Sequence, residues 1–326
     1  MTDALPLPPP PPTVTVGIAT KDRPEALVRC LRSLRLLEGL LAEAIVVDDG
    51  SDPPVEGPAL AALAADLPPD VRFIRNERSV NLAAARNRIA RETATPWVLN
   101  LDDDAFIVSP DAVRAAVAVL EGDLAIAAVA FSQGDETGRA FPPEAQGVAA
   151  DEPCYVPSFV GFAHLLRREA FVAAGGFRER LGINGEEKEL CLRLLDAGYR
   201  VVYLPDAVIG HVADAGGRDR RRYLHQTVRN TTLGALYGEP FPLVLGGAAL
   251  RLWRYFPMRK GWKIHDPGGF GAVVRGLAHE LPAVLHERRP VRWATWTRWR
   301  RMTQSPPEPY VPPAPSVRGT TGEGEG

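Results

Sequence analysis

AAARNRIARETATPWVLNLDDD, residues 83–104, joins the pattern of a helix to that of a buried strand. Its first half is rich in alanine and arginine, which are strong helix formers. Its second half passes through the apolar residues Trp97, Val98 and Leu99 into three consecutive aspartates, Asp102 to Asp104. Adjacent carboxylates at a strand end repel one another and gain nothing from burial. We therefore expect them to bind something that offsets this cost.

The same alternation of strand and helix patterns continues on both sides of this stretch. Strands are predicted at residues 13–19, 43–51, 71–76, 96–104 and 124–132, and helices at 24–37, 58–67, 81–94 and 110–122. Strands that alternate with helices at this spacing are typical of a parallel sheet with right-handed crossovers. The sequence therefore predicts an α/β fold, with a Rossmann-like, mostly parallel sheet flanked by helices.

Polar clusters follow three of the predicted strands: TKDR at 20–23, DDGSD at 48–52 and DDD at 102–104. Ligands of open α/β sheets bind beyond the carboxyl ends of the strands, so these clusters predict one site at that edge. The chain has neither GxGxxG after the first strand nor GxxxxGK followed by Ser or Thr. A dinucleotide Rossmann site and a P-loop are therefore not supported, and a divalent cation on carboxylates is the expected holder of phosphate.

Composition indicates a globular protein without a strong charge bias. The 326 residues carry a net charge of −2 and are 45% hydrophobic, which is ample for a packed core and gives no global attraction to nucleic acid. The three cysteines are far apart and not in CxxC spacing, so neither a disulfide framework nor a zinc site is expected. A reducing, cytoplasmic setting is the simplest prediction.

Both ends of the chain predict disordered tails. Residues 1–12 are proline-rich and lack the basic and apolar regions of a signal peptide. Residues 304–326 are rich in proline and glycine. No uninterrupted apolar run approaches the ~18 residues of a membrane span. The folded part is expected between about 13 and 303.

Four separated motifs resemble glycosyltransferase family 2 in their order and spacing. They are VTVGIATKDRPEALVRCLRSL, IVVDDGSD, AAARNRIARETATPWVLNLDDD and GEEKELCLRLLDAGYRVVYLPDAVIGH, at 14–34, 45–52, 83–104 and 185–211. The resemblance implies a GT-A catalytic domain over 13–212, with a nucleotide half at about 13–105 and an acceptor half at about 106–212. It further implies an inverting enzyme that uses a UDP-, dTDP- or GDP-type sugar donor and a hydroxyl acceptor.

In this family a DxD-type motif after the fourth strand holds Mn²⁺ or Mg²⁺ on the donor diphosphate. The resemblance makes Asp104 the direct ligand and places Asp102 on the ribose or a metal-bound water, hence near the metal. Asp103 belongs to the same donor site. His211 corresponds to a further metal ligand, and imidazole suits Mn²⁺. The alternatives are a solvated acidic turn and a structural histidine.

The resemblance also implies a nucleotide pocket at the first two strand ends. Asp49 would contact the base or ribose, with Thr20, Asp22 and Arg23 lining the same pocket. An Asx-type turn, in which Gly50 supplies the left-handed residue, is the alternative for Asp49, and both can hold at once.

Arg86 would face the diphosphate or brace the aspartate turn; alternatively it is an ordinary surface arginine. The preceding SVN departs from the family, which commonly has Asn and Gly where this chain has Ser79 and Asn81. Because asparagine tolerates a left-handed conformation, Asn81 need not break the turn.

The stretch GINGEEKELCLRLLDAGY predicts a packed helix that ends at Gly198. Glu186 and Glu187 fall in its first turn, where the positive helix end favours ionised carboxylates. The family typically has Glu-Asp here, with the second member as the base that accepts the acceptor's proton. The resemblance therefore assigns Glu187 as base and Glu186 to orienting the acceptor. Glu187 is one methylene longer than the family's aspartate, so the choice between Glu186 and Glu187 as base stays open. The alternative is that both glutamates are simply charges at the N-terminus of a helix.

Beyond residue 212 the resemblance fades into a helical, basic and aromatic extension, residues 213–303. Trp293, Trp296 and Trp299 recur at three-residue spacing among arginines. Tryptophan with arginine is typical of an interfacial helix. We therefore predict peripheral contact with anionic membrane, or with a lipid-linked acceptor, through 288–302. Packing of these aromatics on the catalytic domain is the equal alternative.

Two other functions are compatible with parts of this pattern. A sugar-nucleotidyltransferase predicts a glycine-rich basic loop after the first strand, but ATKDRP at 19–24 has no glycine. A non-catalytic glycan- or partner-binding member predicts loss of the metal or base residues, which are present. The favoured reading is a cytoplasmic glycosyltransferase, or one peripheral on the inner face of the cell membrane.

Overall fold

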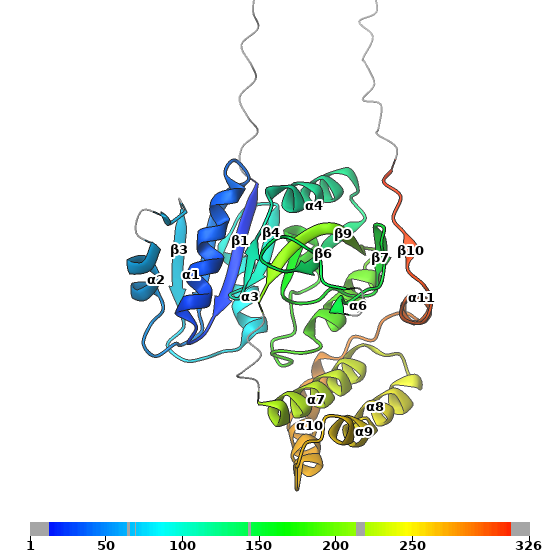
Figure 1. Cartoon of the computed structure of the whole chain (residues 1–326). Coiled ribbons are helices and arrows are strands. Elements are labelled where there is room, and N and C mark those ends of the chain that lie inside the picture. Colours follow the sequence, from blue (N-terminus) through cyan, green and yellow to red (C-terminus); the bar gives the residue numbers. More distant parts are fainter. Residues whose placement is uncertain (1–12, 64–65, 69, 143–144, 213–218, 314–326) are drawn as a thin grey trace, which may run out of the picture.

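The computed structural model describes residues 13–63, 66–68, 70–142, 145–212 and 219–313, and Figure 1 shows the chain. The strands are β1 (Val14–Thr20), β2 (Leu41–Asp48), β3 (Val71–Arg75), β4 (Trp97–Asp102), β5 (Ala105–Ile107), β6 (Ile126–Gly134), β7 (Cys154–Val156), β8 (Ala163–Arg167), β9 (Arg200–His211) and β10 (Glu308–Pro309). The helices are α1 (Pro24–Ser33), η1 (Leu34–Leu37), α2 (Glu56–Leu63), α3 (Leu82–Glu92), α4 (Pro110–Gly122), α5 (Arg168–Ala173), α6 (Glu186–Asp196), α7 (Arg220–Gly238), α8 (Leu243–Trp253), α9 (Tyr255–Gly261), α10 (Gly269–Glu287) and α11 (Trp293–Gln304).

The strands form one mixed sheet in the order β10–β7–β9–β6–β8–β4–β1–β2–β3, and β5 pairs with β9. Strands β4, β1, β2 and β3 are all parallel, as predicted for the nucleotide half. Strand β8 lies antiparallel between β4 and β6, so the acceptor half mixes both directions. The predicted α/β fold with flanking helices is confirmed.

Strand register brings the polar clusters to one edge of the sheet. Asp102 at the end of β4 lies opposite Ala19 of β1, and Thr20 lies opposite Asp48 of β2. Because these strands are parallel, their carboxyl ends coincide. The three clusters therefore meet at a single edge, as predicted.

Helices cover both faces of the sheet (Figure 1). On one face, Leu27 and Leu31 of α1 and Val113 of α4 share one core with inward residues of β1, β4, β6 and β9. On the other face, Ala85 and Ile89 of α3 share a core with Ile45, Val47 and Val98. Successive side chains of a strand point to opposite faces of the sheet, so these residues alternate with those that face α1. A Cβ at Gly17 would lie 2.5 Å from Ile89 Cγ2, so this glycine lets α3 approach β1 closely.

Turn chemistry sets the ends of two helices that carry site residues. Asn81 precedes α3 with φ +97°, and its side chain accepts a hydrogen bond from Ala84 N. The expectation that asparagine tolerates this conformation is therefore confirmed. Gly198, with φ +95°, ends α6, while the amide of Tyr199 returns to the carbonyl of Leu194.

The C-terminal extension is helical, as predicted, and α7 to α10 form a group below the sheet in Figure 1. Helix α7 packs against α8, α9 and α10. Its residues Leu224 and Val228 share a core with Tyr255 and Val273. Leu233 and Tyr237 of α7 form a second core with Leu181 of the catalytic half, so α7 connects the two parts.

The predicted disordered tail at 304–326 needs correction over residues 304–313. Helix α11 runs to Gln304, and β10 pairs antiparallel with β7. Tyr310 is buried edge-on against Tyr155, with ring centroids 5.5 Å apart. Backbone pairing and this aromatic contact outweigh the proline-rich composition that suggested disorder. The remaining tail residues, 1–12 and 314–326, lie outside the described residues.

Candidate active site

The three aspartates after β4 are each held by a different set of donors. Asp103 accepts hydrogen bonds from Thr20 Oγ1 at 2.7 Å and Arg23 Nη1 at 2.6 Å. Asp104 accepts one from Arg23 Nη2 at 2.8 Å. Asp102 accepts one from Arg86 Nη2 at 2.7 Å. Both Asp103 and Asp104 are buried, which contradicts the alternative of a solvated acidic turn.

Burial and hydrogen bonding separate the pKa values of neighbouring carboxyls. Burial raises the pKa of Asp103 to about 7, against the opposing effects of Arg23 and Thr20. Burial also acts to raise the pKa of Asp104, but its interactions with His211 and Arg23 outweigh it and lower that pKa to about 2. The Asp104 carboxylate is therefore ionised at neutral pH, as a metal ligand must be.

Asp102, Asp104 and His211 can offer ligand atoms that all lie within 4.8 Å of one another. Nε2 of His211 lies 3.3 Å from Oδ1 of Asp104. Both atoms are buried and have no hydrogen-bond partner among the described residues. The antiparallel pairing of β5 with β9 sets Ala105 opposite His211 and so brings these side chains together.

The environment of His211 turns its Nε2 toward the aspartates. Its Nδ1 lies 2.8 Å from Oε1 of Gln133. The ring stacks on Phe162, with centroids 5.0 Å apart. A histidine ligand is commonly oriented in this way by a second partner. The nitrogen and oxygen donors present thus fit a divalent cation such as Mn²⁺.

Arg86 is buried at 2% exposure, so the alternative of a surface arginine is wrong. Its Nη2 donates to Asp102 and also to the carbonyl of Gly161, at 2.6 Å. Its Nη1 lies 3.9 Å from Oε1 of Glu186. The guanidinium therefore braces the aspartate turn and sits between that turn and the start of α6.

The two glutamates of α6 occupy different environments. Glu186 is fully buried, and burial together with the charge of Glu187 raises its pKa well above the usual value, despite the opposing charge of Arg86. Glu187 instead lines a cleft. Its Oε1 lies so close to Gly161 that a Cβ on this glycine would be only 2.3 Å away. The structure therefore turns Glu187, and not Glu186, toward the cleft that also contains Asp102.

This cleft has a volume of about 540 Å³. It is lined by residues from β4, β6, β9, α3, α6, α7 and their loops: Leu82, Arg86, Asp102, Gln133, Val160, Gly161, Phe162, Ile183, Asn184, Glu187, His211, Asp219, Arg222, Tyr223 and Gln226. Sequence reasoning missed Gln133 and the residues of α7. The basic pattern after residue 218 was visible in the sequence, but its position beside the cleft depends on how α7 packs.

Asp49 is held by the loop that follows β3. Its carboxylate accepts from Asn76 Nδ2, Ser79 Oγ, and the amides of Val80 and Asn81, at 2.6–3.0 Å. Burial acts to raise its pKa, but these bonds outweigh it and the pKa is lowered. A carboxylate has about four acceptor positions, so the four donors of the loop occupy the acceptor positions of Asp49. Contact with a base or ribose stays a prediction.

Asp22 and Asp48 connect the first two strand ends. Asp22, at φ +55°, accepts from Asp52 N at 2.9 Å and is half exposed. Asp48 accepts from Ser51 N at 2.8 Å, and Gly50 has φ +78°. An Asx-type turn with Gly50 in the left-handed position is therefore present after β2, but Asp48 forms it and Asp49 does not. These loops border the aspartate turn through Thr20 and Arg23.

Comparison with known proteins agrees with this geometry. Residues 15–173 match the family described as Glycosyl transferase family 2. The pre-mycofactocin glycosyltransferases of two Mycobacterium tuberculosis strains are 30% identical over 267 residues, covering 73% of this chain and 51% of theirs. The chain thus spans about half the length of the curated relatives it matches.

Solved structures share the fold at low identity. A mannosyltransferase from Pyrobaculum calidifontis, in complex with GDP-Man and Mn²⁺, superposes with a TM-score of 0.55 at 19% identity, covering 92% of this chain and 87% of that one. GalNAc-T7 with UDP, GalNAc and Mn²⁺ gives 0.57 at 17% identity, with coverages of 84% and 58%. TarS of S. aureus with UDP-GlcNAc gives 0.57 at 13%, covering 83% of each chain. These likenesses confirm the predicted GT-A fold.

Proposed function

We propose that this chain, which belongs to glycosyl transferase family 2 through its residues 15–173, transfers a sugar from a nucleoside-diphosphate donor to an acceptor hydroxyl with inversion. One observation carries the proposal. The buried, unpartnered atoms His211 Nε2 and Asp104 Oδ1 lie 3.3 Å apart at the edge of the cleft that Glu187 lines. A cation site beside an ionisable base is what metal-assisted displacement from a diphosphate requires.

Asp102, Asp104 and His211 are the residues that would hold the divalent cation, Mn²⁺ or Mg²⁺. The donor set supports Mn²⁺, as do the related folds solved with that ion. A bound cation would stabilise negative charge on the departing diphosphate. Arg23 supports this role because it orients Asp103 and Asp104 together.

The nucleotide would lie over the ends of β1 and β2, between Asp49 and the aspartate turn. Thr20, Asp22 and Arg23 would line this pocket, and Asp103 would keep Arg23 in place through its 2.6 Å contact. Solved proteins of this fold carry GDP-Man, UDP or UDP-GlcNAc. A UDP-, dTDP- or GDP-type donor is therefore the proposed class.

Glu187 would accept the proton of the acceptor hydroxyl. Its position in the first turn of α6, in the lining of the cleft, supports contact with an acceptor. The hydroxyl oxygen would then attack the anomeric carbon from the face opposite the leaving diphosphate, in a single displacement without a covalent intermediate. Glu186 would act on the acceptor only through Glu187, since it lies outside the lining of the cleft.

The acceptor would enter past the first turns of α7, where Arg222, Tyr223 and Gln226 line the cleft. A glycan, a lipid-linked sugar or a secondary metabolite offers the hydroxyl that this chemistry needs. None of the described helices is long and apolar enough to cross a membrane. We propose that the enzyme acts in the cytoplasm or peripherally on the inner face of the cell membrane.

Sugar-nucleotide hydrolysis tests the donor half of the proposal without knowledge of the acceptor. A panel of UDP-, dTDP- and GDP-sugars is incubated with protein and Mn²⁺ or EDTA, and released nucleoside diphosphate is measured. We expect one donor to be hydrolysed slowly with Mn²⁺ and not with EDTA, and Asp104→Ala to abolish this. Equal turnover with EDTA, or binding of no nucleotide with Mn²⁺, would overturn the proposal.

The base assignment is tested by a matched pair of variants. Glu187→Gln should lower kcat by roughly 100-fold or more, the usual contribution of a general base, while donor affinity stays unchanged. Glu186→Gln, which makes the same chemical change at the preceding residue, should keep most of the activity. The reverse result would assign the base to Glu186.

A further inference from the structure

Helix α8 is apolar almost all round, yet among its residues only Val244 is buried. Helices of this composition normally lie inside a protein. At 100° per residue, the exposed residues Leu245, Gly246, Ala249, Leu250 and Trp253 fall on one arc of about 140°. Over α8, the adjoining α9 and the residues just before α8, five large side chains are 44–70% exposed: Phe241, Leu245, Leu250, Trp253 and Phe256. An apolar surface of this kind marks an interaction site.

Positive charge surrounds this apolar face. Between Glu239 and Asp266 the sequence contains no acidic residue, but it contains the cations Arg251, Arg254, Arg259, Lys260 and Lys263. A second copy of the chain would bring the same charges against them, which disfavours self-association through this face. A negatively charged, apolar layer is the complementary partner.

A groove of about 480 Å³ between α8 and α11 adds a site for an anionic group. Leu243 and Leu250 supply its apolar side, and Arg254 and Arg300 its cations. Arg254 has no ion-pair partner within the described parts of the chain. The indole Nε1 of Trp296, which also lines the groove, is buried without a hydrogen-bond acceptor among the described residues. Free donors beside an apolar wall suit the phosphate of an amphiphile.

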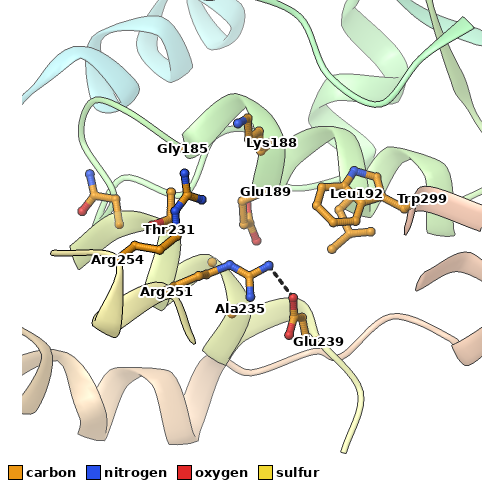
Figure 2. A pocket seen from close by; sticks show the side chains of 12 residues that line it. Gly185, Lys188, Glu189, Leu192, Thr231, Ala235, Glu239, Arg251, Arg254 and Trp299 are labelled. Carbon is orange, nitrogen blue, oxygen red and sulfur yellow. Dashed lines mark hydrogen bonds and ion pairs between the residues drawn. The ribbon is translucent and has the colours of Figure 1, made fainter. Parts of the chain in front are cut away.

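The groove continues toward the catalytic half as a smaller cavity of about 150 Å³, drawn in Figure 2. Both spaces share Glu239, Arg251 and Arg254. Glu239 is bound by Arg251 at 2.6 Å, the dashed contact in Figure 2, so its charge is neutralised and Arg254 stays available. The inner cavity is lined by Gly185, which immediately precedes the two glutamates of α6.

From these observations we propose that α8 and α9 dock the protein on an anionic phospholipid bilayer. Leu245, Leu250 and Trp253 insert at the level of the headgroups and upper acyl chains, and a lipid phosphate lies in the groove against Arg254 and Arg300. This refines the predicted membrane contact, because Trp296 and Trp299 of α11 are largely packed and only Trp293 is more than half exposed. The docking rests on the proposed function only in bringing a lipid-linked acceptor to the cleft.

Vesicle co-sedimentation without any sugar nucleotide tests the docking separately from transfer. The full chain is mixed with phosphatidylcholine vesicles that contain or lack phosphatidylglycerol. We expect binding only to the anionic vesicles, and weaker binding as salt rises, since screening shortens the range of the attraction. Hydrolysis of the donor in solution should be unchanged by variants on this face. Vesicle binding and donor hydrolysis therefore test the docking and the transfer independently of each other.

The decisive variants combine Leu245→Asp with Trp253→Asp, which should lower vesicle binding by roughly tenfold or more. Leu124→Asp is the matched control, because Leu124 is 77% exposed but follows α4 in the catalytic half. Arg254→Glu with Arg300→Glu should also lose binding, while Arg114→Glu on α4 should keep it. Three results would overturn the proposal: equal binding to neutral vesicles, unchanged binding by the α8 variants, or dimerisation that the α8 variants abolish without any vesicle binding.

Discussion

Nε2 of His211 points at Oδ1 of Asp104 across 3.3 Å, and neither buried atom has a hydrogen-bond partner in the described chain. Two buried polar atoms that face each other in this way would be satisfied by a group bound between them, since an unpaired buried polar atom costs about 1–3 kcal/mol. A divalent cation bound by both residues would be such a group.

Gln133→Leu should weaken Mn²⁺ binding by about 10–100-fold, although Gln133 is not among the candidate ligands. Its Oε1 lies 2.8 Å from Nδ1 of His211, and without this contact the ring loses its orientation. Mn²⁺ titration followed by calorimetry measures the effect. Gln304→Leu, at the end of α11, is the control, and equal affinity of the Gln133 variant and the control would refute the role.

Arg86→Met should destabilise the protein by about 1–3 kcal/mol, the usual cost of leaving a polar group in the interior without its partner. The methionine fills similar space but leaves Asp102 and the carbonyl of Gly161 without their donor. Urea unfolding measures the free-energy change. Arg114→Met, on the exposed face of α4, should change stability by no more than about 0.5 kcal/mol. Similar values for both variants would contradict the bracing role.

Asp49→Asn should destabilise the fold by about 1.5–3 kcal/mol at pH 7, since four donors converge on the charged carboxylate. Because its native pKa is lowered, the stabilisation is present above the usual value of 3.8 and is lost as pH falls through the native pKa. The difference between wild type and variant should therefore shrink in acid. Unfolding curves at pH 7 and near pH 3 measure it, and a constant difference would show that ionisation is irrelevant.

Glu186→Gln should have the opposite dependence on pH. The pKa of Glu186 is raised in the folded state, so wild type is penalised as pH rises above the usual value of 4.5, where only the unfolded chain releases its proton readily. Glutamine resembles the protonated acid and avoids this penalty. The melting temperature of the variant, relative to wild type, should therefore rise between pH 4.5 and pH 8. A flat or falling difference would mean that the buried carboxyl is already ionised.

Much of the fold could be predicted from local patterns. Residues close together in the chain are enough to predict the alternation of apolar strands and amphipathic helices. The same holds for the turn of three aspartates after β4 and for the positive φ of Asn81. Parallel strand direction then brought the polar clusters to one edge without further information. The α/β class and the edge that carries the acidic clusters follow from these patterns, whereas the GT-A fold and the candidate metal residues Asp102, Asp104 and His211 were implied by the resemblance to glycosyltransferase family 2.

Side-chain orientation within the site could not be predicted in this way. Glu186 and Glu187 share one helical turn, and only the packing of α6 turns the first into the interior and the second into the cleft. Arg86 has the pattern of a surface residue on an arginine-rich helix. Its burial follows from the meeting of α3 with the Gly161 loop and the aspartate turn.

Local sequence patterns are enough to predict the order of strands and helices up to β6, the turn at the end of β4 and the residue types of the site, because these depend on periodicity and turn chemistry over a few residues. Tertiary structure alone decided that His211 meets Asp104 through the pairing of β5 with β9. It also decided that the apolar arc of α8 stays exposed while the tryptophans of α11 pack inward. Composition shows that tryptophan and arginine occur together, but which helix buries its apolar side depends on neighbours that are distant in the chain.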